Sequence, residues 1–533
     1  MSPLHAHLPP VTARPQPLAR VLASAAAAGL VAVPDALADT PVTDVVSDSR
    51  AVTPGVLFAA LASDGDGTDG HAFVDAALEA GAVAALVAPD YAEANVRDRL
   101  VPTADPRAAV AEAAASLWNR PGDGMALVGI TGTNGKTTTS FLVHGLLTDL
   151  GRTVGLVGTV ENRIGRERYA TAYTTPEAPA LQRLLRAMAQ GGVTHVAMEV
   201  SSHGLALSRV RTLDFGVAVF TNLTHDHLDF HRTPEAYAAA KKALFDGLST
   251  DATAIVNADD PACALMVRDT RARVVTFGTA AGADVRVEVL GNALGGLRLR
   301  LGGQDRTFRM AGRFNALNLA AAYAVGVALG LDADAVLGAL AEAPGVPGRF
   351  ETIRPDDGRP DDASREDVLG IVDYAHTPDA LDNVLATARE IVPAGRALWV
   401  VFGCGGDRDR TKRPAMARVA EARADRVVVT SDNPRTEDAA AILADVVAGL
   451  SRPEDALVIA DRAAAIGAAA VQAAPGDVVV VAGKGHETYQ IIGTTTHDFD
   501  DRAVLRAALA ARSAGTRSTG TRSTAASSER ETL

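Results

Sequence analysis

The stretch that decides the fold is L-V-G-I-T-G-T-N-G-K-T-T-T, residues 127–139. Its apolar start is bounded by glycine and is too short for a helix, which indicates a buried strand. Gly132 and Gly135 then permit a tight turn, and the threonines that follow are expected to open a helix running to about Leu150. A strand, a glycine-rich loop and a helix N-terminus together favour an anion, because free amides and the helix dipole attract negative charge. The stretch therefore predicts a phosphate-binding loop.

Lys136 and Thr137 give this loop the chemistry of a nucleotide site. The lysine supplies a charge for the terminal phosphates, and the threonine hydroxyl can bind Mg²⁺. The strict pattern G-x-x-x-x-G-K-[ST] is not met, because Ile130 stands where its first glycine would be. The shorter G-x-x-G-K-T from Gly132 to Thr137 stands instead. We expect ATP at this loop; the simpler interpretation is a glycine turn with a surface lysine.

Length and composition limit the remaining possibilities. A chain of 533 residues is too long for one core and predicts about two to four domains. A formal net charge of −13 argues against nonspecific binding to nucleic acid. The two cysteines, Cys263 and Cys404, cannot form a disulfide framework and fit a reducing compartment. No apolar run is long enough to span a bilayer, so we expect no membrane partner.

One N-terminal feature resembles a signal peptide. Arg14 and Arg20 precede the apolar run 21–33, and A-L-A follows at 36–38. The alternative is an alanine-rich helix of the first domain behind a loose, proline-rich leader. Because a chain that uses ATP belongs in the cytoplasm, we expect the helix and a cytoplasmic protein.

The alternation of apolar and polar segments predicts an α/β protein of three domains. These are a mixed α/β N-terminal domain, a central P-loop domain with a doubly wound parallel sheet, and a C-terminal Rossmann-like α/β domain. The predicted order is a flexible leader at 1–17, then domains at 18–125, 126–345 and 346–512, and a disordered Ser/Thr/Arg-rich tail at 513–533. Central strands are expected at 154–158, 193–200, 217–221 and 254–256, and C-terminal strands at 369–372, 397–403, 426–430, 457–459 and 478–482.

Two polar clusters follow strands of the central domain. Glu199 ends one strand, and a carboxylate at that place in a P-loop domain can hold Mg²⁺. The segment T-N-L-T-H-D-H-L-D-F-H at 221–231 follows a later strand and is denser in histidine and aspartate than packing requires. A polar surface turn is the alternative. Zinc is disfavoured, because no cysteine or H-E-x-x-H partner lies nearby.

Three loops of the C-terminal domain should meet at one sheet edge. They are C-G-G-D-R-D-R at 404–410, S-D-N-P-R at 431–435 and G-K-G-H-E at 483–487. Arg408 and Arg435 suit carboxylate recognition, because guanidinium binds carboxylate through two parallel hydrogen bonds. Glu487 could hold an ammonium group. Taken singly each is most simply a solvated loop charge, but together they predict a site for an amino acid.

These motifs resemble the Mur ligases of peptidoglycan synthesis over nearly the whole chain. The matching motifs, in chain order, are G-x-x-G-K-T, E-V-S-S-H-G, D-H-L-D-F-H, F-N-A-L-N, D-Y-A-H-T-P-D-A, G-C-G-G-D-R-D, D-N-P-R and G-K-G-H-E. The D-N-P-R form is similar to that of the members that add diaminopimelate. The resemblance implies an ATP-dependent ligase that joins meso-diaminopimelate to a UDP-N-acetylmuramoyl dipeptide through an acyl phosphate.

The resemblance also implies which residues bind. For ATP these are Gly132, Thr133, Asn134, Gly135, Lys136, Thr137, Thr138, Asn315 and Asp373. For Mg²⁺ they are Thr137, Glu199 and His227, with Lys241 as a CO₂-derived carbamate (N6-carboxylysine) supporting a second ion. Lys136, Lys241, Glu199 and His227 are the implied catalytic group. For the UDP substrate they are Ser47, Ser49, Thr174, Thr175, Ser201 and Arg209. For diaminopimelate they are Arg408, Asp432, Asn433, Pro434, Arg435, Gly483 and Glu487.

Some positions depart from the family pattern, and other functions stay open. Leu207 stands where close relatives often have glutamine, Tyr173 where some have asparagine, and the loop 63–69 on the uracil side does not align. The related folylpolyglutamate synthases use a similar loop, although the D-S-R at 48–50 and the D-N-P-R loop speak against them. A regulatory or scaffold protein that only binds nucleotide would need neither Lys241 nor an amino-acid pocket. We expect a monomer with no nucleic-acid partner.

Overall fold

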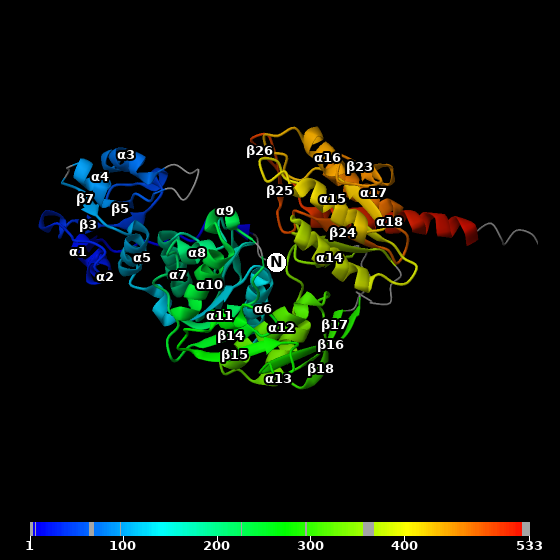
Figure 1. Cartoon of the computed structure of the whole chain (residues 1–533), viewed down its shortest axis with the longest axis horizontal. Coiled ribbons are helices and arrows are strands. Elements are labelled where there is room, and N and C mark those ends of the chain that lie inside the picture. Colours follow the sequence, from blue (N-terminus) through cyan, green and yellow to red (C-terminus); the bar gives the residue numbers. More distant parts are fainter. Residues whose placement is uncertain are drawn as a thin grey trace, which may run out of the picture. The chain divides into compact units, whose positions relative to one another are not determined.

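The computed structural model describes residues 4–5, 7–62, 69–95, 98–224, 226–293, 296–354 and 367–524. The chain forms two compact units. One consists of Met1–Val287 with Leu317–Leu340, and the other of Glu288–Ala316 with Ala341–Leu533. Figure 1 colours the chain from blue at the N-terminus to red at the C-terminus. The three-domain division stays a prediction.

The first unit begins with a small parallel sheet in the order β4-β5-β6-β7. Its two middle strands, β5 and β6, are continuous buried apolar runs, as expected of a parallel sheet covered on both faces. Their bounds are β4 Asp44–Val46, β5 Val56–Ala59, β6 Ala84–Val87 and β7 Leu100–Pro102. The surrounding helices are α1 Leu18–Val21, α2 Ala23–Ala27, α3 Val74–Glu79, α4 Pro89–Ala94 and α5 Pro106–Leu117.

The apolar N-terminal run is part of this domain's core. It forms two short helices rather than one, and Leu18, Val21, Leu22 and Ala25 are fully buried. Their packing against the sheet supports the helix interpretation over the signal-peptide one. The predicted flexible leader also contains paired residues: β1 Leu4–His5 joins β11, and β2 Gln16–Pro17 joins β3 Pro41–Val42.

The central sheet of the first unit follows the order β11-β10-β9-β12-β8-β13-β14-β15. The pairs from β9 to β15 are all parallel, which confirms the doubly wound sheet. Strand bounds are β8 Ala126–Thr131, β9 Val154–Val157, β10 Asn162–Ile164, β11 Glu167–Tyr169, β12 His195–Glu199, β13 Phe215–Phe220, β14 Thr253–Asn257 and β15 Arg273–Gly278. Helix bounds are α6 Lys136–Asp149, α7 Ala178–Gln190, α8 Ser202–Ala206, α9 Leu228–His231, α10 Pro234–Asp246, α11 Cys263–Met266, α12 Phe314–Ala328 and α13 Ala333–Glu342.

Several strands of the later central region were not predicted. Strand β16 spans Val285–Ala293, and β17 Gly296–Leu301 pairs antiparallel with β18 Gln304–Phe308. The segment G-L-R-L-R-L alternates between buried leucine and exposed arginine, which is the period of a half-buried strand. That alternation was visible in the sequence and would have predicted β17.

The second unit contains a sheet in the order β19-β20-β24-β21-β22-β23, parallel except for the edge strand β19. The five predicted strands are all present, as β20 Leu369–Asp373, β21 Leu398–Phe402, β22 Arg426–Val429, β23 Leu457–Val458 and β24 Val478–Ala482. The other elements are β19 Glu351–Ile353, β25 Tyr489–Ile492, β26 Thr495–Asp498, α14 Pro378–Ile391, α15 Lys412–Arg423, α16 Ala439–Val447, α17 Arg462–Gln472 and α18 Asp501–Thr524. The centre of the sheet is buried on both faces by two apolar clusters.

The C-terminal tail differs from the prediction of disorder from Ser513. Helix α18 continues to Thr524, and residues 525–533 lie outside the described part of the chain. Leu505 and Leu509 pack into the core at the start of the helix. Once the first turns of the helix are packed against the core, each further residue that joins the helix gains one backbone hydrogen bond. The segment contains no proline that would end the helix. No helix in the described ranges is long and apolar enough to cross a membrane.

Candidate active site

The phosphate loop between β8 and α6 can be built only with glycine at its two bends. Gly132 has φ +149° and Gly135 has φ +86°. A Cβ on Gly132 would collide with the Thr221 hydroxyl, and one on Gly135 would lie 2.6 Å from Asn318 Oδ1. Both the conformation and the close approach therefore require glycine, and they place the loop at the carboxyl edge of the parallel sheet.

Two lysines lie at this loop. Lys136 Nζ donates to Gly132 O at 2.8 Å and to Thr133 O at 2.9 Å. Lys241, from α10, donates to the same Gly132 oxygen at 2.8 Å, although it lies more than a hundred residues away. Its side chain is buried, with Nζ 4.4 Å from the centroid of the Tyr237 ring. Burial, together with the positive charge of Lys136, lowers the pKa of Lys241 well below its ordinary value.

Glu199 ends β12 as a fully buried carboxylate. Thr137 Oγ1 donates to its Oε2 at 2.8 Å, so two predicted metal ligands are in direct contact. Thr159, which was not predicted, donates its amide to Oε1 at 2.8 Å and its hydroxyl to Oε2 at 3.1 Å. Its place directly after the end of β9 was the signal that could have identified it, because ligand-binding groups gather at that edge.

The histidine-rich segment after β13 lies beside Lys241. His227 has φ +53° and lies 3.4 Å from Asp226 through Nε2, and burial lowers its pKa. The His203 and His227 rings are 4.9 Å apart, centroid to centroid. Burial, with the neighbouring histidines, lowers the pKa of His203 to about 4. The lowered pKa values favour the neutral form of both imidazoles, which is the form that binds metal ions. His225 lies outside the described residues.

The donors at this edge fit Mg²⁺ better than zinc. Over the described ranges no group of three or more His, Cys, Asp and Glu side chains could hold a metal ion. Thr137 and Glu199 offer a hydroxyl and a carboxylate, which are oxygen donors. Mg²⁺ is commonly held by one or two carboxylates together with water and substrate phosphates, so a sparse oxygen set beside a phosphate loop suits it.

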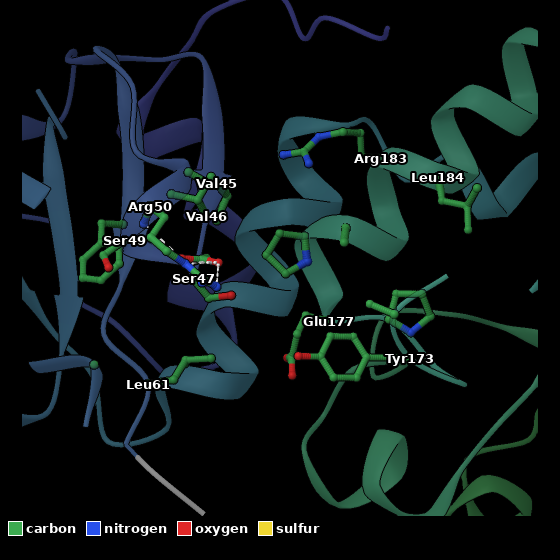
Figure 2. Close-up of a pocket in the computed structure, with 18 of the residues that line it drawn as sticks. Val45, Val46, Ser47, Ser49, Arg50, Leu61, Tyr173, Glu177, Arg183 and Leu184 are labelled. Carbon is green, nitrogen blue, oxygen red and sulfur yellow. Dashed lines mark hydrogen bonds and ion pairs between the residues drawn. The ribbon is translucent and has the colours of Figure 1, made fainter. Parts of the chain in front are cut away.

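A pocket of about 870 Å³ opens elsewhere in the same unit. Ser47 and Ser49, both predicted to bind the UDP substrate, line it. Figure 2 shows them facing Tyr173 and Glu177, which precede α7. Asp48 and Arg50 of the D-S-R motif also line it, as do residues that the sequence did not single out, among them Phe58, Phe73, Arg107 and Arg183. Size and polarity suit a sugar nucleotide.

Three of the other predicted substrate residues, Thr174, Thr175 and Ser201, lie near Glu199 and do not line the pocket. Thr174 Oγ1 lies 2.9 Å from Thr159 Oγ1. The Thr175 hydroxyl is buried and donates to Glu199 O at 2.8 Å. The same hydroxyl accepts the Ser201 amide at 3.0 Å. The Thr175 hydroxyl is therefore used within the protein and shapes the backbone.

Arg209 connects these two groups of residues. It donates to Thr175 O at 2.9 Å, forms an ion pair with Glu177, and lies 5.2 Å from the centroid of the Tyr173 ring. Both Tyr173 and Glu177 also line the pocket. A ligand that extends from the pocket past Tyr173 would therefore be directed towards Glu199.

In the second unit, the side chains of the two further residues predicted to bind ATP are hydrogen-bonded to backbone groups. Asn315 is buried and donates to Ala311 O at 2.7 Å. Asp373 accepts the amides of Phe350 at 2.7 Å and Ala375 at 2.8 Å, while burial raises the pKa of its carboxyl. Both side chains fix the local backbone.

The loops after β22 and β24 meet around Lys484, a fully buried lysine that the sequence did not single out as a site residue. Its Nζ donates to Asn433 Oδ1 at 2.8 Å and lies 3.5 Å from Glu487 and 3.8 Å from Asp432. Asn433 Nδ2 in turn donates to Glu487 Oε2 at 3.0 Å. Burial and the nearby Asp432 carboxylate raise the pKa of Glu487. A bound cation would stabilise the two carboxylates at this end of the site. Gly483 is held close to Asp432, since a Cβ there would lie 2.6 Å from Asp432 Oδ2.

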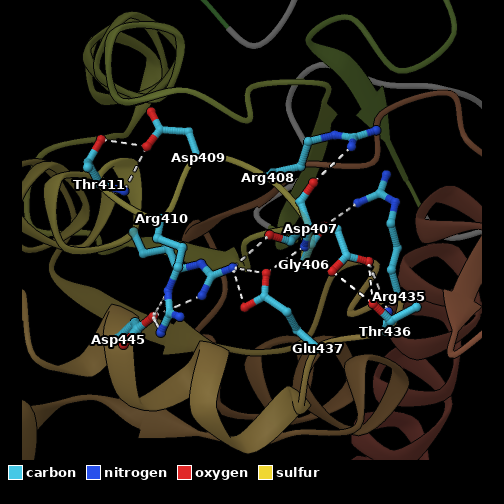
Figure 3. Close-up of polar contacts among 12 residues, drawn as sticks. Gly406, Asp407, Arg408, Asp409, Arg410, Thr411, Arg435, Thr436, Glu437 and Asp445 are labelled. Atoms are coloured by element: carbon cyan, nitrogen blue, oxygen red, sulfur yellow. Dashed lines mark hydrogen bonds and ion pairs between the residues drawn. The ribbon is translucent and has the colours of Figure 1, made fainter. Parts of the chain in front are cut away.

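The two predicted carboxylate-binding arginines are brought to one loop. Arg408 Nη1 donates to Asp407 O at 2.9 Å, and Arg435 Nη1 donates to Gly406 O at 2.8 Å. Figure 3 shows Arg408 and Arg435, which come from different loops, each hydrogen-bonded to the Gly406–Asp407 segment. Pro434 supplies a carbonyl that packs so closely on Gly406 that no Cβ would fit there. The loop can therefore hold the two guanidinium groups where both can bind carboxylates.

The chain matches two family models: "Mur ligase middle domain" at residues 130–326 and "Mur ligase, glutamate ligase domain" at residues 348–485. It is 46% identical over 476 residues to "UDP-N-acetylmuramoyl-L-alanyl-D-glutamate--2,6-diaminopimelate ligase" of Geobacillus thermodenitrificans, covering 87% of this chain and 94% of that one. The protein of the same name from Solibacter usitatus is 43% identical, covering 89% and 94%.

A solved structure titled "Structure of UDP-N-acetylmuramoyl-L-alanyl-D-glutamate--2, 6-diaminopimelate ligase" is also similar. It is 35% identical with a TM-score of 0.65, and the match covers 90% of this chain and 97% of that one. The chain therefore belongs to the Mur ligase family.

Proposed function

We propose that the chain uses ATP to join the amine of meso-2,6-diaminopimelate to the D-Glu γ-carboxylate of UDP-N-acetylmuramoyl-L-alanyl-D-glutamate. As a Mur ligase the chain is an ATP-dependent, amide-bond-forming ligase. The observation that carries the choice of amino acid is the loop geometry in the second unit. Arg408 and Arg435 are held on consecutive carbonyls, in the domain that also carries the acidic cluster of Asp432 and Glu487.

Charge matching supports a diamino diacid at this site. Two guanidinium groups suit carboxylates, and the acidic cluster suits an ammonium group. L-Lysine lacks the distal carboxylate, so binding it would leave Arg435 without its partner. An unpaired, partly desolvated cation costs roughly 1–3 kcal/mol, which is enough to reject lysine by one to two orders of magnitude.

The uridine end of the other substrate is proposed to lie in the pocket of Figure 2, lined by Ser47 and Ser49. Its peptide end would extend past Tyr173 and Arg209, which connect the pocket with the surroundings of Glu199. This route would bring the D-Glu γ-carboxylate to the phosphate loop. Thr174 and Ser201 are proposed as contacts on the way.

The phosphate loop from Gly132 to Thr138 is proposed to bind ATP, with Lys136 pairing with the terminal phosphates. Thr137, Glu199 and His227 would hold Mg²⁺, which neutralises charge on the transferring phosphoryl group when bound. Burial and the neighbouring Lys136 lower the pKa of Lys241, which favours the uncharged amine, the form that reacts with CO₂ to give a carbamate. A carbamate there would place a negative charge between Lys136 and the metal site, where it would support a second ion.

The reaction then proceeds in two steps. An oxygen of the γ-carboxylate attacks the γ-phosphorus of ATP, giving an acyl phosphate and ADP. The amine attacks the acyl carbon, the C–O bond to phosphate breaks, and the amide, phosphate and a proton are released. The protein contributes positioning and charge: Lys136 stabilises the phosphoryl group, and the acidic cluster with Glu487 orients the amino acid.

An isotope experiment tests this chemistry. The dipeptide substrate labelled with ¹⁸O in its γ-carboxylate should transfer one ¹⁸O to the released phosphate. Unlabelled phosphate would contradict the acyl-phosphate route. A folylpolyglutamate synthase would instead release phosphate with a folate and glutamate.

The need for ATP supports a cytoplasmic protein, and we propose that it acts as a monomer.

A further inference from the structure

The 404–410 loop, which carries Arg408 and accepts a hydrogen bond from Arg435 of the 431–435 loop, is held by a buried cation outside the amino-acid site. Arg413, in the first turn of α15, has a fully buried side chain. Its Nη2 donates to both carboxylate oxygens of Glu437, at 2.8 and 2.9 Å, and its Nη1 donates to Asp445 Oδ2 at 2.8 Å. A buried guanidinium that contacts two carboxylates resists movement, because leaving both would leave its charge unpaired in the interior.

Glu437 connects this joint to the loop. Its Oε1 accepts the Asp407 amide at 2.5 Å. Asp407 has φ +53°, a conformation that a residue with a side chain adopts at a cost. Its carboxylate is held from the other side by the Thr436 amide at 3.1 Å and hydroxyl at 2.9 Å. The Asp407 residue is therefore fixed through both its backbone and its side chain (Figure 3).

The same short segment sets the separation of the two arginines. The carbonyls of Gly406 and Asp407 accept from Arg435 and Arg408 respectively. The Gly406 amide is itself held by Asn433 O at 2.9 Å. If the Asp407 residue rotated, both guanidinium groups would move with it. The carboxylate-binding pair thus depends on a peptide segment that Glu437 anchors.

We propose that Arg413 and Glu437 are positioning residues for amino-acid specificity. Arg413 fixes Glu437, Glu437 fixes the Asp407 amide, and that segment sets the spacing of Arg408 and Arg435 for the two carboxylates of the incoming amino acid. This inference rests on the proposed function. Neither residue is assigned a contact with substrate, and the effect of changing them is on recognition rather than on the phosphoryl-transfer step.

A matched pair of variants separates positioning from plain stability. Glu437→Gln and Asp445→Asn each remove one carboxylate from Arg413, and Asp445→Asn also removes the partner of Arg410. Only Glu437 contacts the Asp407 amide. We expect Glu437→Gln to raise the KM for diaminopimelate by about tenfold, as for one lost charge-assisted hydrogen bond, and to reduce the preference over L-lysine. In Glu437→Gln the KM for ATP should stay unchanged. In Asp445→Asn the KM for diaminopimelate and the KM for ATP should both stay unchanged.

Equal changes in the diaminopimelate KM in the two variants, or an unchanged KM in Glu437→Gln, would overturn the proposal. Circular dichroism and thermal unfolding report whether each variant folds. If Glu437→Gln does not fold, a second pair replaces it: Thr436→Val against Thr411→Val. Both threonines hydrogen-bond an aspartate of the same loop, Thr436 to Asp407 and Thr411 to Asp409.

The second pair tests the same chain of contacts from the opposite side. Thr436→Val should raise the KM for diaminopimelate and Thr411→Val should not, and equal behaviour would overturn the proposal. A wild-type protein that releases no phosphate with diaminopimelate would refute the proposed function itself. An active wild type with all four variants alike would refute only the positioning role.

Discussion

Lys136 and Lys241 donate to the same carbonyl oxygen, that of Gly132, each at 2.8 Å. Two ammonium groups on one acceptor repel each other, and Lys241 is the buried one. The pKa of Lys241 is accordingly lowered, which favours the uncharged form of its amine. We propose that this arrangement prepares Lys136 to bind phosphate and Lys241 to react with CO₂.

Lys241→Ala should therefore reduce kcat by about 100-fold or more, the usual scale for losing a preorganised charge at the reacting phosphate. A short carboxylate such as formate should restore part of the activity by occupying the space of the carbamate. Lys242→Ala is the matched control, because Lys242 is also buried but pairs with Asp246 and Asp269. A loss in both variants, or no rescue, would argue against the carbamate.

Glu199→Gln should reduce kcat by about 10²- to 10³-fold and raise the Mg²⁺ concentration needed for half-maximal activity. The amide keeps the shape of the side chain but removes the charge that the Thr137 and Thr159 hydroxyl groups face. Steady-state kinetics over a Mg²⁺ titration measures both effects. An unchanged Mg²⁺ requirement would remove Glu199 from the proposed metal site.

Arg435→Ala should raise the KM for diaminopimelate and bring it close to that for L-lysine, because the distal carboxylate loses its partner. A loss of roughly 2 kcal/mol corresponds to about thirtyfold. Arg410→Ala is the control: Arg410 lies in the neighbouring loop but pairs with Asp445. Kinetics that leave the ratio of the two KM values intact in Arg435→Ala would contradict the assignment of Arg435.

His144→Leu should flatten the acid side of the stability profile. Burial lowers the pKa of His144 from 6.5 to about 4. Between these values the unfolded chain binds a proton that the folded chain does not, so the free energy of unfolding falls as the pH falls from 6.5 to 4. The contribution is at most about 3 kcal/mol. Urea unfolding at pH 7 and pH 5 measures it, and an equal drop in both proteins would contradict the prediction.

The strands and the edge at which ligands gather could be predicted because the signals are local. Each parallel strand is an apolar run ended by glycine or a polar residue, and the polar residue at its carboxyl end then falls at the shared edge. This placed Thr137 and Glu199 together, and the structure brings them into contact. Lys241 lies within a helix and was placed with them only by the family resemblance, and the structure brings it to the same phosphate loop.

The residues that hold the site in shape could not be found in this way. Arg413 and Lys484 are charged residues in polar segments, a pattern typical of solvated side chains. They are fully buried because distant carboxylates, carbonyls and amides converge on them, and the sequence does not show that convergence. Thr159 differs from these two, because its place after the end of β9 could have identified it, although its contact with Glu199 of another strand could not be read from the sequence.

The central claim is the identity of the added amino acid, and phosphate release measures it most directly. The purified protein should be given ATP, Mg²⁺ and UDP-N-acetylmuramoyl-L-alanyl-D-glutamate, with meso-diaminopimelate and L-lysine in parallel. We expect sustained release with diaminopimelate and little with lysine, because only the first pairs with Arg435. Release with lysine alone would contradict the role of the D-N-P-R loop, and release with neither would contradict the ligase itself.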